Sequence, residues 1–381
     1  MSEQAAPGRT VTGAGFLAFL LTGVVQATYG PSIPHIASRF EVSIGAAGLI
    51  VTAHFLGECI GIAVLGLTRS RLGLARRLMS CALVFSVGLI AASMAPTWPL
   101  LLLAVTLLGC GAGGLVILVN LYFATRFGRR SPAMLSFVNA IYGVGSFLGP
   151  ALVGITGGYA PVLAGAGVVG LVSVAGFTRT PRATPPTPDA PRLVSGRTVG
   201  FVVTFAVLLF IYEGLESGVA TWEATDLVSL GGSVQFAAAA TSFYWVAFTL
   251  GRVFAAPLAV RLSPPTLILG ALTVATVVLL GIRLHLYAPL GFAIVGLCAA
   301  PIFPVALTWL TKVLPNAATV LTYVILGAIF GSAIVPAILG ALISVAGIQS
   351  LPLGVAACAI VTLCIVAIVS ARLRDRLEAS A

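Results

Sequence analysis

Three acidic residues stand deep inside long apolar runs of the sequence: Glu58, Glu213 and Glu216. If these runs cross a membrane, a charged side chain at mid-bilayer costs at least about 2.5–3.5 kcal/mol, so such groups normally face water or one another. A poorly hydrated site also favours the protonated carboxyl group near neutral pH, as a proton carrier requires. We therefore expect each of the three to be a candidate proton-coupling site.

Spacing sorts these carboxylates into two groups. Glu58 follows His54 by four residues, so in a helix both lie on one face and can share a proton, although a static polar contact has the same geometry. Glu213 and Glu216 are three residues apart on one helix face, where repulsion between two carboxylates keeps one of them protonated. The alternative for Glu216 is a shallow position where water hydrates it together with Glu223.

Arg252 is the only basic residue deep in an apolar run. A guanidinium group does not shed its charge, so it requires a carboxylate, backbone carbonyls or an anionic substrate as its partner. Glu58 and Glu213 are the available carboxylates. A salt bridge that opens in one conformation would be a gate, whereas a permanent one would be structural, and the sequence favours neither.

Other polar and aromatic side chains also interrupt the apolar runs. These candidates for a substrate cavity are Gln26, Tyr29, Asn120, Asn139, Tyr142, Tyr244, Trp245 and Trp309. Each has a structural alternative, because amides join helices within a membrane and Tyr and Trp form belts at its surface. Trp222, which lies beside Glu223 and near Asp226 at the outer end of its run, is expected in such a belt.

The composition excludes a soluble enzyme. Of 381 residues, 59% are hydrophobic and 8% are charged, whereas soluble domains carry about 25% charged residues. The net charge of +10 would suggest a nucleic-acid partner in a soluble protein, but here the basic residues cluster between apolar runs. All six cysteines lie inside apolar runs and none forms a C-x-x-C pair, which argues against disulfides and a zinc or other metal site.

Apolar runs bounded by Arg, Pro and Gly predict twelve membrane-spanning helices. Their expected ranges are 12–30, 44–68, 77–95, 98–125, 132–156, 158–178, 198–222, 235–261, 265–284, 287–311, 316–345 and 350–371. With the N-terminus in the cytoplasm, all but three of the 20 Lys and Arg residues fall on the cytoplasmic side, as the positive-inside rule requires. We therefore predict a multi-pass protein of the cell membrane with both termini in the cytoplasm.

A proline-rich polar stretch divides the chain near its midpoint. We expect residues 179–197 to be a cytoplasmic linker between an N-terminal bundle of six helices, 1–178, and a C-terminal bundle of six helices, 198–381. Five prolines between residues 181 and 191 make this segment an extended connection rather than a folded domain.

The two halves repeat one another in sequence. Residues 145–154 align with residues 331–340 and share Gly, Ser, Pro, Ala and Gly, and Gly57-Glu58 corresponds to Gly251-Arg252 at a similar separation. Parallel repeats of six helices are the layout of many secondary transporters. We therefore predict an all-α membrane protein built from two pseudo-symmetric bundles of six helices.

The loop between the second and third predicted helices carries a known signature. Residues 66–77 resemble the motif G-x-x-x-D-R-x-G-R-[RK] of the major facilitator superfamily, although Ser70 replaces the acid of that motif. The matching residues are Gly66, Arg71, Gly73, Arg76 and Arg77. The resemblance covers nearly the whole chain and implies two bundles around a central cavity that opens alternately to each side. It also implies that Gln26, Asn120 and Trp309 line this cavity.

A narrower resemblance concerns the substrate. The run from Tyr212 to Trp222 is similar to the seventh span of the fucose, glucose and galactose permease group. Sugar–proton relatives commonly carry carboxylates where this sequence has Gln26 and Asn120, so their coupling residues cannot be carried over. We predict a secondary transporter that moves a small polar solute, bound between the halves, with H⁺ coupled through Glu213 and assisted by the other two deep carboxylates. Na⁺ suits the same oxygen ligands.

The leading alternative is a drug–proton antiporter. Gly145-x-x-x-Gly149-Pro150 partly resembles the fifth-span motif of such antiporters, although Ser136 replaces the upstream glycine of the full motif. The run from Gly109 to Gly114 matches G-x-G-x-x-G, but it lies inside an apolar span and is better explained by close helix packing than by a dinucleotide. We expect a monomer in the lipid bilayer, with no enzymatic activity, organic cofactor or nucleic-acid partner.

Overall fold

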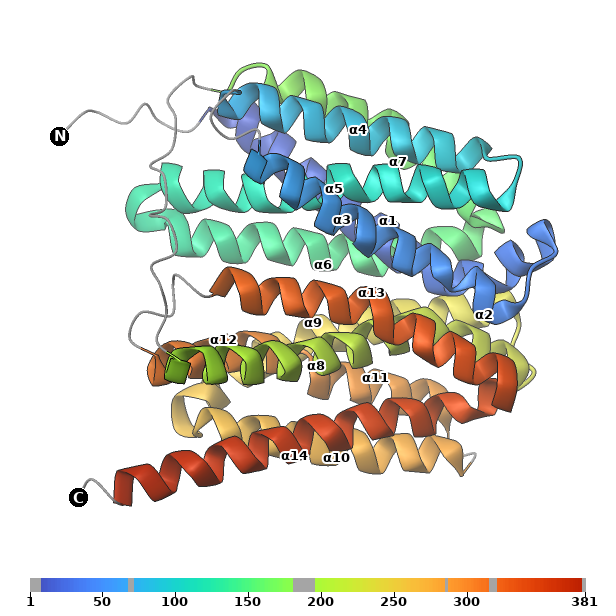
Figure 1. Ribbon diagram of the computed structural model, residues 1–381. Coiled ribbons are helices and arrows are strands. Elements are labelled where there is room, and N and C mark those ends of the chain that lie inside the picture. The colour runs from blue at the N-terminus through green and yellow to red at the C-terminus, as the bar shows by residue number, and fades with distance from the viewer. Residues whose placement is uncertain (1–7, 68–71, 181–195, 285–286, 315–320, 379–381) are drawn as a thin grey trace. The chain divides into compact units, whose positions relative to one another are not determined.

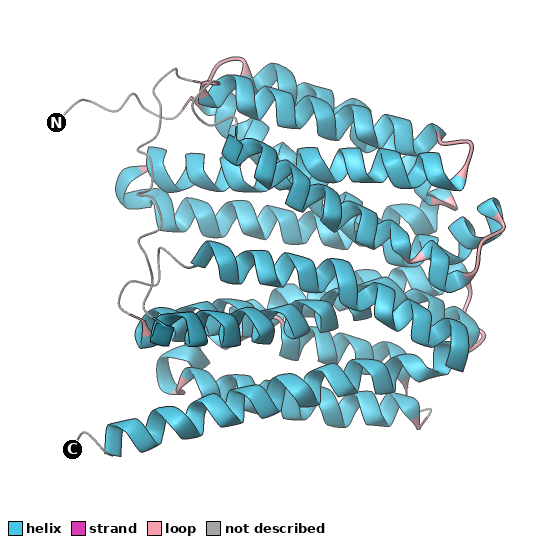
Figure 2. Cartoon of the chain, viewed as in Figure 1, coloured by secondary structure: helices cyan, strands magenta, loops and turns pink. Residues whose placement is uncertain are grey.

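The computed structural model describes residues 8–67, 72–180, 196–284, 287–314 and 321–378. Helices make up almost all of these residues, and no strand occurs among them (Figure 2). The α-helices are α1 (Arg9–Phe40), α2 (Ile44–Ala47), α3 (Leu49–Leu67), α4 (Leu74–Met94), α5 (Trp98–Arg126), α6 (Ser131–Thr156), α7 (Tyr159–Phe177), α8 (Gly196–Ser229), α9 (Val234–Arg261), α10 (Pro264–Arg283), α11 (Ala288–Ala299), α12 (Ile302–Val313), α13 (Leu321–Ala346) and α14 (Leu351–Glu378). Two short 3₁₀ helices, Gly128–Arg130 and Ile348–Ser350, connect some of them.

Twelve helical stretches in the described part of the chain are long and apolar enough to cross a membrane. This number confirms the predicted count of spans and the all-α fold. The helices α2 and α3 together form the second stretch, and α11 and α12 form the tenth. The break between α11 and α12 lies at Ala300 and Pro301, where the proline has no N–H to donate to the preceding turn.

The first span is longer than predicted. It was expected to end at residue 30, but α1 continues to Phe40 through Pro31 and Pro34. Prolines are tolerated inside membrane helices, because neighbouring helices and Ser or Thr side chains compensate for the missing hydrogen bonds. The helix ends at Glu41, which adopts a left-handed conformation with φ 54°.

The described helices belong to two compact units. Unit 1 comprises Met1–Thr187 with Ser233–Ser242, and unit 2 comprises Pro188–Gly232 with Phe243–Ala381. The first turns of α9 therefore group with unit 1 and the rest of this helix with unit 2. Most of the predicted linker, 179–197, lies outside the described residues, so the predicted domain limits stay a prediction.

Helix pairings within unit 1 recur within unit 2 (Figure 1). In unit 1, α1 packs against α6 and α7, and α4 packs against α5 and α7. In unit 2, α8 packs against α13 and α14, and α10 packs against α11 and α14. Because α8 is the seventh span and α13 the eleventh, these pairs match those of the first and fifth spans, as the sequence repeat implies.

The repeated glycines make equivalent contacts in the two units. Gly145 of α6 packs against the Leu20 carbonyl of α1, and Gly331 of α13 packs in the same way against the Phe210 carbonyl of α8. Neither position has room for a Cβ atom. A helix pair that approaches this closely requires a glycine at the contact, which explains why the two halves retain it in their sequences.

Candidate functional site

A buried chain of hydrogen bonds joins α1 to α3 in unit 1. The Tyr29 hydroxyl lies 2.9 Å from His54 Nδ1, and His54 Nε2 lies 3.2 Å from Glu58 Oε1. The exposed fractions of the three residues are 1%, 0% and 7%. When Tyr29 donates to Nδ1 and Nε2–H donates to the carboxylate, both contacts are satisfied with a neutral imidazole. The three side chains therefore satisfy one another within a small, closed network.

Close packing of α3 against α5 positions this network. Gly109 of α5 lies against the His54 carbonyl, and Gly113 lies against the backbone of Glu58. In the opposite direction, Gly57 of α3 lies against the Thr106 carbonyl, with no room for a Cβ atom. The G-x-G-x-x-G run is thus a helix-packing surface, as predicted. Its glycines bring α5 against the turn of α3 that carries the histidine and the carboxylate.

A second polar cluster lies in unit 2, on α8. The Tyr212 hydroxyl is 2.6 Å from Glu216 Oε2 and 2.9 Å from the Ala299 carbonyl oxygen of α11. Tyr212 has one hydroxyl hydrogen, and a carbonyl oxygen can only accept. Both contacts are hydrogen bonds at once when Tyr212 donates to Ala299 and a protonated Glu216 donates to the Tyr212 oxygen. This geometry accommodates a proton on Glu216.

Glu213 lies one turn before Glu216 and is half-buried. The Ser332 hydroxyl of α13 donates to Glu213 Oε2 at 3.4 Å, a long hydrogen bond that joins the seventh and eleventh spans within unit 2. The two carboxylates therefore have different partners: Glu213 is bound by a serine of α13, whereas Glu216 is bound by a tyrosine of its own helix.

Arg252 is exposed and stacks on a ring one turn earlier in α9. Its guanidinium carbon lies 4.8 Å from the centroid of the Phe248 ring. Of the two carboxylates predicted as its partner, Glu58 pairs with His54 instead. Arg252 nevertheless lies within electrostatic range of Glu216 and Tyr212. Its role as a gate or an anion contact stays a prediction.

The predicted cavity residues fall into three environments. Gln26 of α1 accepts a hydrogen bond from the Tyr142 hydroxyl of α6. The amides of Asn120 and Asn139 instead donate to carbonyls four residues earlier in their own helices, at 2.9 and 2.8 Å. The aromatic candidates of unit 2 are buried, and they are Tyr244, Trp245 and Trp309. The Trp309 ring packs edge-on against Phe205 with centroids 5.1 Å apart.

The end of α8 differs from the prediction. Trp222 is fully buried and donates from Nε1 to the Pro336 carbonyl of α13 at 3.0 Å, so its assignment to an interfacial belt is wrong. Glu223 and Asp226, expected at the outer end of the span, have exposed fractions of 0% and 3%. The sequence does contain a signal for this burial. Successive spacings of four, seven and three residues place four polar side chains on one face of the helix: Tyr212, Glu216, Glu223 and Asp226.

The loop motif lies only partly within the described residues. Ser70 and Arg71 fall outside them. Gly66 lies in the last turn of α3, and Gly73 directly precedes α4. Arg76 is exposed, whereas Arg77 is half-buried and donates from Nη2 to the Leu65 carbonyl at 3.1 Å. This bond links the start of the third span to the end of the second.

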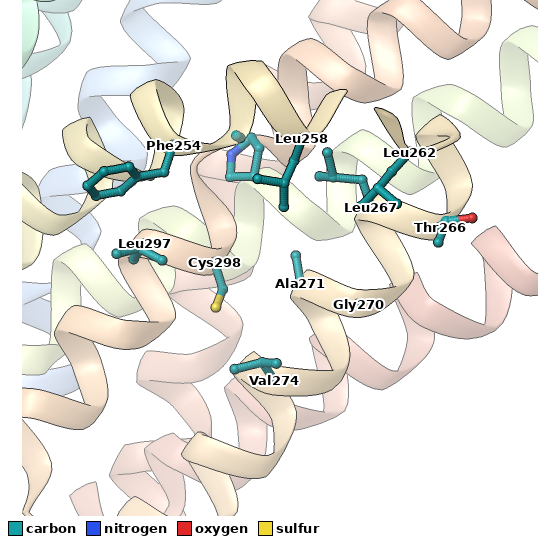
Figure 3. Close-up of a pocket in the computed structure, with 13 residues that line it drawn as sticks. Phe254, Leu258, Leu262, Thr266, Leu267, Gly270, Ala271, Val274, Leu297 and Cys298 are labelled. Atoms are coloured by element: carbon teal, nitrogen blue, oxygen red, sulfur yellow. The ribbon is translucent and has the colours of Figure 1, made fainter. Parts of the chain in front are cut away.

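An apolar cavity of about 260 Å³ lies within unit 2, between α9, α10 and α11. Figure 3 shows Phe254, Leu258 and Leu262 on one side and Ala271 and Val274 on another. None of the predicted site residues lines it, and its walls offer few hydrogen-bonding groups to a polar solute. The cavity is therefore separate from the candidate site.

The chain was compared with known proteins. Residues 15–227 match the family model of the Major Facilitator Superfamily. The chain is 30% identical over 141 residues to an uncharacterized transporter, y4wD, of Sinorhizobium fredii, a match that spans 37% of this chain and 36% of that protein. It is 22% identical over 351 residues to the glucose/mannose transporter GlcP of Bacillus subtilis, which covers 86% of each protein.

The fold was compared with solved structures. The crystal structure of a D-xylose-proton symporter superposes with a TM-score of 0.77 at 15% identity, covering 94% of this chain and 96% of that one. At this identity the likeness concerns the fold. The family model matches more than half of the residues, and the helices, repeats and loop motif agree with it. The chain therefore belongs to the Major Facilitator Superfamily and is a secondary transporter, not an enzyme.

Proposed function

We propose that this protein is a proton-coupled transporter of a monosaccharide or a similar small polyhydroxylated solute. The names of two similar proteins support this substrate class: a glucose/mannose transporter and a D-xylose-proton symporter. The buried carboxylates of the chain supply groups that can bind and release the coupling proton. Alternating access of the site to the two sides of the membrane would then couple the proton gradient to solute movement.

The observation that carries the proposal is the geometry around Tyr212. One hydroxyl hydrogen faces two acceptors, Glu216 and the Ala299 carbonyl, and a proton on Glu216 turns both contacts into hydrogen bonds. Loss of that proton leaves a half-buried carboxylate that competes with Ala299 for a single donor. Protonation of Glu216 thus changes how α8 is bonded to α11, which is the kind of link between proton and helix that coupling requires.

The network in unit 1 supports the same proposal. His54 binds Glu58 through one ring nitrogen and Tyr29 through the other, so a proton gained or lost by Glu58 would change the hydrogen bonds that connect α3 to α1. We assign Glu58 and His54 to proton coupling together with Glu216. Glu213 was predicted as the main coupling residue; because Ser332 binds it, we propose instead that it lies beside the solute, where a carboxylate can accept hydrogen bonds from sugar hydroxyls.

The remaining features of the proposal follow from the sequence. The distribution of Arg and Lys supports a cell-membrane protein with cytoplasmic termini. We propose that H⁺ rather than Na⁺ is the coupling ion, because the buried carboxylates have histidine and tyrosine partners, which relay protons. We also propose that the protein acts as a monomer.

Reconstitution into proteoliposomes tests this function. We expect an imposed pH gradient to drive accumulation of labelled glucose, mannose or xylose. Glu216→Gln and Glu58→Gln should abolish accumulation while solute exchange at equal pH persists, since an amide binds hydrogen-bond partners but carries no exchangeable charge. Glu41→Gln, at an exposed helix end, is the matched control and should behave like the wild type.

Three outcomes would contradict the proposal. Accumulation driven by a Na⁺ gradient at constant pH would show that Na⁺, and not H⁺, is the coupling ion. Unchanged accumulation by both carboxylate variants would show that Glu216 and Glu58 do not carry the coupling proton. Transport of cationic dyes without transport of any sugar would favour drug–proton antiport, which the names of the similar proteins do not favour.

A further inference from the structure

The apolar cavity of unit 2 has no part in the proposed transport mechanism. It is a groove of about 260 Å³ between α9, α10 and α11 (Figure 3). Small residues leave this space, among them Gly251 of α9 and Gly270 and Ala271 of α10. No atom lies within 4 Å of a Cβ added at Gly270, so the chain itself does not fill this part of the groove.

The groove is open along its apolar side. Phe254, Leu258 and Val274 line it and have exposed fractions of 57%, 48% and 48%. These side chains belong to α9 and α10, which are the eighth and ninth membrane spans. Apolar surface that a membrane helix exposes is stable when hydrocarbon rather than water covers it. The groove therefore requires an apolar occupant.

The length of the groove matches one leaflet of a bilayer. Along α9 its lining runs from Gly251 to Leu262, and eleven residue steps at the rise of an α-helix give about 16.5 Å. The hydrocarbon core of a bilayer is about 30 Å thick, so one leaflet contributes about 15 Å. One acyl chain of a phospholipid crosses one leaflet and fits the groove from end to end. A helix of another protein, about 10–12 Å across, is too wide to enter it.

One end of the groove carries polar and charged groups. Leu262 and Thr266 line this end, where α9 ends at Arg261 and α10 begins at Pro264. The Arg261 side chain is exposed and forms no ion pair with the described residues. The Thr266 hydroxyl lies 2.7 Å from the Ser263 hydroxyl, so two hydroxyl groups accompany the guanidinium group. A guanidinium group beside hydroxyls is complementary to a phosphate group.

The predicted orientation places this end of the groove at the cytoplasmic surface. The distribution of basic residues assigns Arg261 to the cytoplasmic side. The cytoplasmic leaflet carries anionic lipids, and each basic residue near the surface adds to their attraction. No acidic residue lines the groove to oppose a negatively charged head group.

We propose that this groove binds an anionic phospholipid of the cytoplasmic leaflet, with one acyl chain along α9 and its phosphate at Arg261. The acyl chain lies against Phe254, Leu258 and Val274 and covers the Cys298 thiol of α11, which lines the groove in Figure 3. The bound lipid stabilises unit 2, because a ligand of the folded state shifts the unfolding equilibrium. None of the groups assigned to proton coupling lines the groove, so the lipid site is independent of the proposed function.

Lipid titration by native mass spectrometry tests the head-group contact. The probes are dioleoylphosphatidylglycerol and dioleoylphosphatidylcholine, which have the same acyl chains, and the first carries a net negative charge. We expect the delipidated protein to prefer phosphatidylglycerol. Arg261→Gln should weaken binding of this lipid about fivefold, as the loss of one basic residue at an anionic surface implies, and leave phosphatidylcholine binding unchanged.

Arg129→Gln, at an exposed arginine of a short 3₁₀ helix in unit 1, is the matched control and should keep the wild-type preference. If Arg261→Gln binds phosphatidylglycerol as tightly as this control, the phosphate does not lie at Arg261 and the proposal is overturned.

Filling the groove tests where the acyl chain lies. Val274→Trp places a large side chain in the groove and should abolish specific binding of phosphatidylglycerol. Val277→Trp, at an exposed valine of the same helix outside the groove, is the control and should bind like the wild type. If Val274→Trp folds poorly, Ala271→Leu fills the same space with a smaller side chain. Equal lipid binding by the filled variant and the control would overturn the site. A wild-type dimer that Val274→Trp dissociates would show that a second copy covers the groove, and would also overturn it.

The Cys298 thiol reports directly on the groove. The reaction of the six free cysteines with N-ethylmaleimide can be followed for each cysteine by peptide mass spectrometry. Phosphatidylglycerol should slow the labelling of Cys298 and leave that of Cys364, an exposed thiol of α14, unchanged. The protection should disappear in Val274→Trp. Labelling of Cys298 that is the same with and without the lipid would show that the acyl chain does not occupy the groove.

Discussion

The polar clusters of the two units are built differently, although the packing of their helices repeats. In unit 1, Tyr29, His54 and Glu58 bind one another in a closed chain that includes both nitrogens of the imidazole ring. In unit 2, one face of α8 carries Tyr212, Glu216, Glu223 and Asp226, and the oxygens of Glu223 have no partner in the described part of the chain. The first cluster is satisfied without further ligands, and the second is not.

The difference arises at side chains rather than at the helix contacts. Gly57 of α3 packs on a main-chain carbonyl of α5, and Gly251 of α9 packs in the same way on the Leu297 carbonyl of α11. The next residue is the buried Glu58 in one unit and the exposed Arg252 in the other. The repeat thus preserves where backbones meet, while the residues beside these contacts have acquired separate chemistry. Disrupting a shared glycine contact should therefore destabilise the protein in whichever unit the substitution is made. Substituting a polar group should have an effect in one unit that has no counterpart in the other.

The largest effect is expected from a shared contact. Gly331→Leu inserts a side chain against the Phe210 carbonyl and should destabilise the protein by about 3 kcal/mol or more, because backbone atoms must move apart. Gly145→Leu should do the same in unit 1. The readout is the apparent melting temperature in detergent. Gly270→Leu, where no atom lies within 4 Å of an added Cβ, is the control. Equal melting of Gly331→Leu and Gly270→Leu would show that the repeat contact is not tight.

The next effect separates the two clusters. His54→Ala removes the central group of the unit 1 chain and leaves the Tyr29 hydroxyl and the Glu58 carboxylate buried without their shared partner. Loss of one member of a buried ionic network costs about 3 kcal/mol. A lowered melting temperature measures this cost, and His35→Ala, at an exposed histidine, serves as the control. A variant as stable as the control would mean that the chain does not hold α1 to α3.

A smaller effect distinguishes a partnered tyrosine from an unpartnered one within unit 2. Tyr212→Phe removes the donor to Ala299 and the contact with Glu216, which should cost about 1–2 kcal/mol. Tyr244→Phe removes a hydroxyl that has no hydrogen-bond partner among the described residues, so its effect on stability should be close to zero. Parallel melting curves of the two variants give the comparison directly. A larger loss for Tyr244→Phe would place a hydrogen bond where the described structure has none.

Much of this architecture was predictable from the sequence. Long apolar runs of the required length identify spans because a helix is the solution that satisfies its own backbone in lipid, and twelve of them were confirmed. The glycine run from 109 to 114 was interpreted as packing, and the structure places Gly109 and Gly113 against the backbones of His54 and Glu58. The partnership of His54 with Glu58 also followed from their spacing, because residues four apart share a helix face.

Other parts depended on tertiary contacts that no local pattern records. Trp222 looks like a belt residue by position, but Pro336 of α13, far away in sequence, offers it a buried carbonyl. Tyr29 joins His54 across 25 residues, and Tyr212 reaches Ala299 across 87. The burial of Glu223 and Asp226 likewise depends on which helices surround the last turns of α8. Hydropathy falls at these residues, so their position alone suggested the membrane surface.

The smallest effect concerns the position that corresponds to Glu58. Arg252 is exposed and stacks on Phe248, and a cation over a ring at an exposed site contributes about 0.5–1 kcal/mol. Arg252→Lys keeps the charge but loses the planar stacking group, so we expect destabilisation by about 0.5 kcal/mol at most. Arg261→Lys, exposed at the end of the same helix, is the control and should melt like the wild type. If Arg252→Lys were instead as unstable as His54→Ala, Arg252 would belong to a permanent ion pair. The two repeat positions would then carry equivalent buried networks, and the contrast between the units would not hold.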